Sequence, residues 1–134
     1  MPLQRIDHIG VIVEDMDAAR AFVSGVLGLE LARERDIGDL KTAFFRCGDC
    51  EIELIEPRTE ELRRQRLGEG NRARIEHIAI EVDKLQETLD GLGTHGVRAG
   101  DGPRVIGPNL NVWTDAATSE GVMYQLVEKN VAPE

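Results

Sequence analysis

A chain of 134 residues, 41% hydrophobic and 31% charged, has the composition of an ordinary globular protein and the length of one domain, residues 1–134. Its formal net charge of −9 argues against binding to nucleic acid or to an anionic membrane surface, because both attract clustered positive charge. No apolar run is long enough to span a membrane, and the N-terminus lacks the pattern of a secretory signal. We therefore expect a cytoplasmic protein, and two cysteines fit a reducing compartment.

The first half of the chain, about 5–57, has the pattern strand, helix, strand, strand, strand. Alternating apolar residues predict the first strand over 6–13. An acidic start at Glu14 and Asp15 and helical spacing through Val26 predict a helix, which Gly28 ends. Three more strands are predicted over 29–33, 41–46 and 50–56.

The two cysteines form the motif Cys47-Gly48-Asp49-Cys50 between two predicted strands. Such a motif is compatible with half of a zinc site or with a redox pair, but the chain has no second pair to complete four zinc ligands. We favour a hairpin turn, because Gly-Asp between two strands is typical of one.

An arginine-rich connector, 58–74, follows the first half. A short helix is predicted to begin after Thr59 and to end at Gly68. Two interpretations stay open for the arginines: a solvated connector, which we favour, or a basic rim that meets a phosphate or carboxylate group of a substrate. The arginines are Arg58, Arg63, Arg64, Arg66, Arg72 and Arg74.

The second half, about 75–128, repeats the first. Residues 75–82 match 6–13 with an offset of 69, and residues 123–128 match 51–56 with an offset of 72. Between them we predict a helix from Leu85 to Leu92 and strands over 97–99, 109–114 and 121–128. The fold class is therefore predicted as α+β, with two βαβββ repeats related by a pseudo-twofold axis.

Each repeat contributes one histidine and one oxygen ligand at matched positions. His8 and His77 point away from the apolar faces of their strands, and each is followed two residues later by a small residue, Gly10 or Ala79. Glu53 and Gln125 stand at matched positions of the two closing strands. His8, Glu53, His77 and Gln125 form a set of two nitrogens and two oxygens. Such a set suits a six-coordinate divalent ion with two positions for water or substrate.

These motifs resemble the vicinal oxygen chelate superfamily, which includes glyoxalases, bleomycin resistance proteins and dioxygenases. Residues 6–11, 28–31, 52–57 and 76–82 are most similar to methylmalonyl-CoA epimerase and next to glyoxalase I. The resemblance implies a mixed-sheet cleft that holds cobalt, nickel, zinc, manganese or iron. It also implies a homodimer and a small-molecule substrate, such as an acyl-CoA or a glutathione adduct.

The resemblance has one departure. The epimerases carry glutamine at the position of Glu53 and glutamate at that of Gln125, so this chain has the two exchanged. The family's second base comes from the region of Lys41 and Thr42, where no carboxylate stands, nor does one stand at 108–111. An amide cannot usefully accept a proton, so we predict Glu53 as the base in a one-base proton transfer.

The resulting prediction is a metal-dependent isomerase, epimerase or lyase that removes a proton next to a carbonyl, with the metal stabilising the enolate or enediolate. Glyoxalase I-like lyase chemistry is the first alternative. An Fe(II) dioxygenase is the second, although members of that type place the glutamate where Gln125 stands. A non-catalytic drug-binding module is the third.

Five other side chains have simpler interpretations. His95 is interpreted as a surface residue or a cation at a helix end. Phe45 and Trp113 either line the cleft or fill the core, and we favour the core. Asn109 and Asn111 lie on a strand that lines the cleft in the family, where hydrogen bonds to substrate are conceivable.

Overall fold

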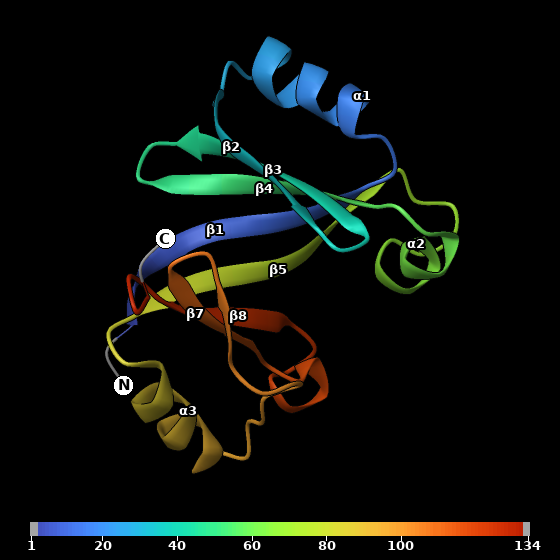
Figure 1. Ribbon diagram of the computed structural model, residues 1–134. Helices are drawn as coiled ribbons and strands as arrows, with labels where there is room; N and C mark the ends of the chain where they lie inside the picture. The colour runs from blue at the N-terminus through green and yellow to red at the C-terminus, as the bar shows by residue number, and fades with distance from the viewer. Residues whose placement is uncertain (1–2, 133–134) are drawn as a thin grey trace. The chain divides into compact units, whose positions relative to one another are not determined.

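The computed structural model describes residues 3–132 of the chain. These residues form two compact units (Figure 1). One unit is the segment His8–Glu76, and the other combines residues 3–7 with residues 77–132. The division falls inside β1 (Leu3–Val13) and β5 (Ala73–Val82), immediately before His8 and His77.

The His8–Glu76 unit holds a four-stranded sheet in the order β2-β3-β4-β1. β1 pairs with β4 in parallel, and the other pairs are antiparallel. A helix follows β1, beginning as α1 and continuing as a π-helical segment, and a second helix follows β4. The elements are α1 (Met16–Arg20), η1 (Ala21–Val26), β2 (Glu30–Ile37), β3 (Leu40–Cys47), β4 (Cys50–Pro57) and α2 (Glu60–Arg66).

The other unit repeats this plan with the sheet order β5-β8-β7-β6. β5 and β8 are parallel, and the remaining pairs are antiparallel. The elements are α3 (Leu85–Gly93), β6 (Arg104–Ile106), β7 (Asn109–Trp113), the 3-10 helix η2 (Ala116–Thr118) and β8 (Met123–Glu128). The α+β class and the two βαβββ repeats are confirmed.

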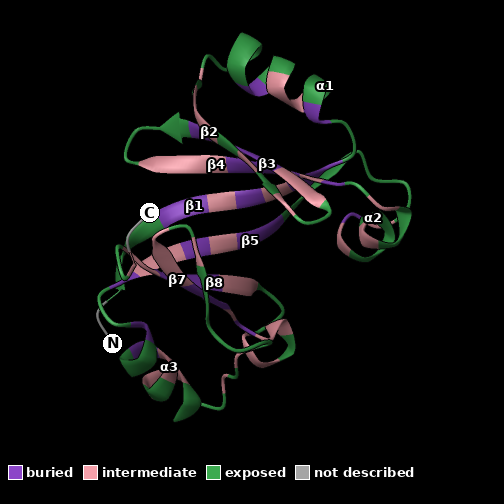
Figure 2. Cartoon of the chain, in the orientation of Figure 1, coloured by how far each residue is buried: buried purple, intermediate pink, exposed green. Residues whose placement is uncertain are grey.

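Each sheet buries one apolar face against the helix of its own repeat. Figure 2 shows that buried residues occur along the strands of both units. Val13, Leu54 and Phe45 pack with Met16 in the first unit, and Val82 and Leu126 pack with the α3 helix in the second. Phe45 is thus a core residue, as predicted. The histidines lie on the opposite faces of their strands, because successive strand side chains alternate.

Most predicted boundaries hold within a few residues, but the strand over 97–99 is wrong. Ala99 makes only an isolated bridge with Thr114. The strand of this region is β6, which pairs with β7 across the turn at Gly107 and Pro108. Gly100, Gly102 and Pro103 interrupt regular pairing after residue 99, whereas Val105 is half exposed and gives β6 no clear alternation.

The Cys47–Cys50 motif is a hairpin turn, as predicted. Cys47 and Cys50 face each other as the last pair of the β3–β4 ladder. Gly48 has a φ of +64°, a left-handed conformation in which glycine avoids the steric cost of a Cβ.

No helix within residues 3–132 is long and apolar enough to cross a membrane.

A glutamate of the closing strand holds the start of the helix in both repeats. Glu56 Oε2 accepts a hydrogen bond of 2.7 Å from the backbone N–H of Met16, and Glu128 Oε1 accepts one of 2.8 Å from Leu85. The first N–H groups of a helix have no partner within the helix, and their positive dipole favours a carboxylate. The duplication therefore includes the contact that joins each helix to its sheet.

We expect Glu56→Ala to lower the free energy of unfolding by about 1.5 to 3 kcal/mol, the range for a hydrogen bond to a charged group. Glu56→Gln keeps an acceptor oxygen and should lose less. Urea denaturation followed by circular dichroism measures both changes. An alanine variant as stable as the parent would show that the contact does not stabilise the helix.

Candidate metal centre

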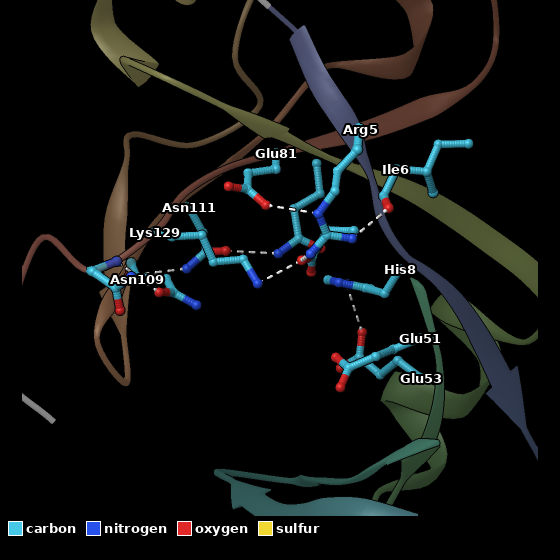
Figure 3. A network of polar contacts seen from close by, with 12 residues as sticks. Arg5, Ile6, His8, Glu51, Glu53, Glu81, Asn109, Asn111 and Lys129 are labelled. Carbon is cyan, nitrogen blue, oxygen red and sulfur yellow. Dashed lines mark hydrogen bonds and ion pairs between the residues drawn. The ribbon is translucent and has the colours of Figure 1, made fainter. Parts of the chain in front are cut away.

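His8 and Glu53 lie together on neighbouring parallel strands of the first unit. The ladder places Gly10 opposite Glu53, so the residue beside the carboxylate has no side chain. His8 Nε2 lies 3.3 Å from Glu53 Oε1, as the dashed line in Figure 3 marks. The two residues are only 5% and 8% exposed. A buried imidazole nitrogen beside a carboxylate oxygen is a pair of donors that suits a divalent transition metal.

An aromatic ring and an arginine surround this pair. The edge of Phe44 meets the His8 ring at a centroid distance of 5.5 Å. Arg33 lies 4.0 Å above the centre of the Phe44 ring and makes two hydrogen bonds of 2.8 and 2.9 Å to Glu51. The arginine is therefore held by both a carboxylate and an aromatic face, which fixes the ring against the histidine.

His77 and Gln125 occupy the matching positions in the second unit. The ladder places Ala79 opposite Gln125, and the two candidate ligands are 2% and 5% exposed. Trp113 meets the His77 ring edge-on at 6.5 Å, and Arg104 lies 5.3 Å from the centre of the Trp113 ring. The sequence predicts Trp113 as core, but it is only partly buried and it contacts the histidine instead.

The two units thus repeat one arrangement: an imidazole, an oxygen-bearing side chain on the parallel neighbouring strand, an aromatic ring and an arginine. Phe44 and Trp113 are 69 residues apart in the sequence, the same offset as His8 and His77. The alignment of the two repeats could therefore have identified these two aromatic residues as equivalent. The binding of one ion by His8, Glu53, His77 and Gln125 together stays a prediction.

A buried acid precedes each histidine, and each acid is paired with cations. Asp7 Oδ1 accepts from Lys129 at 2.6 Å and from Arg5 at 3.2 Å. Glu76 accepts two hydrogen bonds from Arg66, at 2.7 and 2.9 Å. Sequence reasoning missed this feature, although an acid before both histidines was visible in the repeat.

Arg66 connects the helix α2 to the candidate centre. Burial lowers the pKa of Arg66, but its hydrogen bond to Glu76 and the negative charges of Glu76 and Glu53 raise it more, so that the net shift is upward. The cation is therefore permanent, and by Coulomb's law its charge favours the ionised form of Glu53 in return.

The rest of the connector supports the solvated interpretation. Arg58 pairs with Asp36 at 2.9 Å, and Arg64 pairs with Glu60 one helical turn away. With Arg66, three of the six arginines are thus compensated by carboxylates of their own unit. His95 lies on the surface after the end of α3, as predicted.

Comparisons with known proteins agree with the observed fold. Residues 5–117 match the model of the glyoxalase/bleomycin resistance protein/dioxygenase superfamily. An ethylmalonyl-CoA/methylmalonyl-CoA epimerase of Cereibacter sphaeroides is 32% identical over 116 residues, which cover 77% of this chain and 80% of that protein. The uncharacterised protein YqjC of Bacillus subtilis is 34% identical over 102 residues, 72% of this chain and 70% of that one. The crystal structure of methylmalonyl-CoA epimerase from Mycobacterium tuberculosis has a TM-score of 0.84 at 22% identity, covering 95% of this chain and 89% of that chain, which shows a common fold.

We expect Arg66→Met to lower the free energy of unfolding by about 3 kcal/mol, because it leaves the buried carboxylate of Glu76 without its cation. The matched control is Arg64→Met on the same helix, whose exposed pair with Glu60 contributes about 0.5 kcal/mol or less. Urea denaturation measures both. The double variant Arg66→Met/Glu76→Gln should recover much of the loss, and equal effects of the two single variants would contradict the structural role of Arg66.

Proposed function

Because the chain belongs to the glyoxalase/bleomycin resistance protein/dioxygenase superfamily, we propose that it is a metal-dependent enzyme that transfers a proton at a carbon next to a carbonyl. Epimerisation of an acyl-CoA is the first reaction to consider, since relatives over most of the chain are named as such epimerases. The observation that carries the proposal is the buried pair of His8 Nε2 and Glu53 Oε1, 3.3 Å apart.

The donors of both units fit a divalent ion. Imidazole nitrogen and carboxylate or amide oxygen are the ligands that cobalt, nickel, zinc, manganese and iron accept. We propose His8, Glu53, His77 and Gln125 as these ligands. The matched registers, Gly10 with Glu53 and Ala79 with Gln125, support the set. The chain also passes from one unit to the other immediately before each histidine.

The metal, when bound, acts as a Lewis acid on substrate oxygen and lowers the pKa of the C–H bond beside the carbonyl. Glu53 then removes the proton: the C–H bond breaks, its electron pair stays in the substrate, and the carboxylate is protonated. In an isomerisation the same carboxyl group returns the proton to the neighbouring carbon. In an epimerisation a water molecule protonates the opposite face of the same carbon, and the resulting hydroxide takes the proton back from Glu53. The amide oxygen of Gln125 is not basic enough for this step, so only Glu53, in the first repeat, acts as the base.

The surroundings of Glu53 suit a base. Its side chain and the adjacent Phe44 are about a tenth exposed or less, which keeps bulk water from competing for the proton. The permanent charge of Arg66 favours the ionised carboxylate that the reaction requires at its start.

Isomerisation of a glutathione hemithioacetal, as in glyoxalase I, is the second candidate, and one observation favours it. β3 carries Thr42 in the region where the epimerases have their second base, and its hydroxyl donates to the backbone carbonyl of Arg35. A single base that moves a proton between adjacent carbons needs no second base.

We also propose that the protein is a homodimer, as expected from the family. Analytical ultracentrifugation measures its oligomeric state.

Glu53→Gln should keep the bound metal through its amide oxygen and lose about 10²- to 10⁴-fold in turnover, the usual contribution of a general base. Proton exchange is followed by NMR as solvent deuterium incorporation into methylmalonyl-CoA and into the methylglyoxal–glutathione adduct. Glu56→Gln is the control: it changes the same residue type on the same strand, but at the position that holds the helix. A Glu53→Gln variant as active as the parent would remove Glu53 from the mechanism.

Removal of the metal with a chelator should abolish exchange, and one equivalent of cobalt should restore it. His8→Ala should weaken cobalt binding, measured by calorimetry. Oxygen uptake by the iron-loaded protein without proton exchange would instead favour a dioxygenase. A protein that binds no metal but binds an aromatic drug would favour the sequestering module.

A further inference from the structure

Gln125 makes a buried side-chain hydrogen bond. Its Nε2 donates to Oδ1 of Asn111 at 2.8 Å, and the two residues are 5% and 4% exposed. Asn111 lies on β7, which pairs antiparallel with β8, where Gln125 lies. A ligand amide differs from a carboxylate in having one accepting end and one donating end, so its orientation decides whether it can bind a cation.

The orientation of Asn111 is itself fixed. Its Nδ2 donates to the backbone carbonyl of Asn109 at 3.1 Å (Figure 3). A carbonyl oxygen can only accept, so Asn111 must turn its NH₂ group toward Asn109 and its oxygen toward Gln125. Gln125 must then present its own NH₂ group to Asn111. The Oε1 atom of Gln125 therefore lies on the branch of the amide that points away from Asn111.

The first repeat has a different side chain and a different contact at the equivalent position. Thr42 corresponds to Asn111, since Thr42 pairs with Ile55 in one ladder and Asn111 pairs with Val127 in the other. The Thr42 hydroxyl donates toward β2, to the carbonyl of Arg35, at 3.4 Å. The half that supplies a carboxylate has no ligand amide to orient, because either carboxylate oxygen accepts.

We propose that Asn111 is a positioning residue that fixes the Gln125 amide with its oxygen toward a divalent cation. This inference rests on the proposed function, since it assigns a role relative to the same ion. The inference is based on the hydrogen bond between the side chains of Gln125 and Asn111, which belong to the same unit. The Asn109 carbonyl fixes the orientation of the Asn111 amide, and Asn111 in turn fixes the orientation of the Gln125 amide.

The test is cobalt affinity of the metal-free protein, measured by calorimetry without substrate. Asn111→Leu removes the acceptor at similar volume and should weaken cobalt binding about 10- to 100-fold, the usual effect of losing a residue that orients a metal ligand. Asn111→Asp loses the donor to Asn109 but keeps an acceptor oxygen toward Gln125 whichever way it turns, and its negative charge also favours a cation, so the affinity should be at least that of the parent. Asn109→Ala is the matched control, because it keeps the backbone carbonyl that Asn111 uses.

A double-mutant cycle separates orientation from general damage. In a Gln125→Glu background either carboxylate oxygen can bind the cation, and the carboxylate meets the Oδ1 atom of Asn111 as a second acceptor, so Asn111→Leu should not weaken cobalt binding there. Equal losses in the parent and in the Gln125→Glu background would overturn the inference, as would an Asn111→Leu protein with the affinity of the parent. If Asn111→Leu does not fold, loss of affinity in Asn111→Asp would overturn it as well.

The same titration distinguishes failure of the inference from failure of the proposed function. A parent protein that binds no cobalt, nickel or zinc would overturn the proposed function and this inference together. A parent that binds cobalt and loses it in His8→Ala, but not in Asn111→Leu, would overturn the inference alone.

Discussion

The parallel pairing of the first and last strands of each repeat is the constraint on which the candidate centre depends. It places Gly10 beside Glu53 in one unit and Ala79 beside Gln125 in the other, with each histidine two residues earlier on the same strand. A parallel pair requires a long crossover, and here the helix and two further strands provide it. The helix is joined back to the closing strand by a glutamate, so the strand that carries a candidate ligand also holds the start of the helix.

The acids next to the two histidines, Asp7 and Glu76, are buried, and Glu51 beside His8 is partly buried, which is costly unless every charge has a partner. The first unit meets this cost with Arg66 on Glu76 and Arg33 on Glu51. The second meets it with Lys129 on Asp7. Arg66 lies on a connector helix, Arg33 on a strand, and Lys129 on the segment after the last strand. The cations that pair with the acids therefore do not occupy equivalent positions in the two repeats.

Much of this molecule follows from its sequence because the repeat doubles every signal. The match of residues 6–13 with 75–82 predicts the fold, and the matched positions of Glu53 and Gln125 predict which oxygen ligands belong with the histidines. β6 was missed because its pairing depends on the turn at 107–108, and half-exposed Val105 gives no periodic pattern. The sequence offers Asn111 only as one option for a hydrogen bond to substrate. Its bond to Gln125 is not predictable, because no sequence pattern shows which way a buried amide turns.

In the proposed centre, one half supplies a carboxylate and the other an amide, and the surroundings of the two side chains differ in a way that suits each group. A carboxylate binds a cation through either oxygen and can also take a proton, so Glu53 needs a charge environment more than an orientation, and the cation of Arg66 lies in its unit. An amide cannot take a proton and binds through one atom only, so Gln125 needs an orientation, and Asn111 supplies a contact that dictates one. Consider a chain with glutamine at position 53 and glutamate at position 125 but with all neighbouring residues unchanged. The carboxylate at position 125 would face the Oδ1 atom of Asn111, so that two acceptors would be in contact. The amide at position 53 would have no asparagine equivalent to Asn111 to orient it. The identity of each proposed ligand is therefore coupled to the identity of its neighbours within each half.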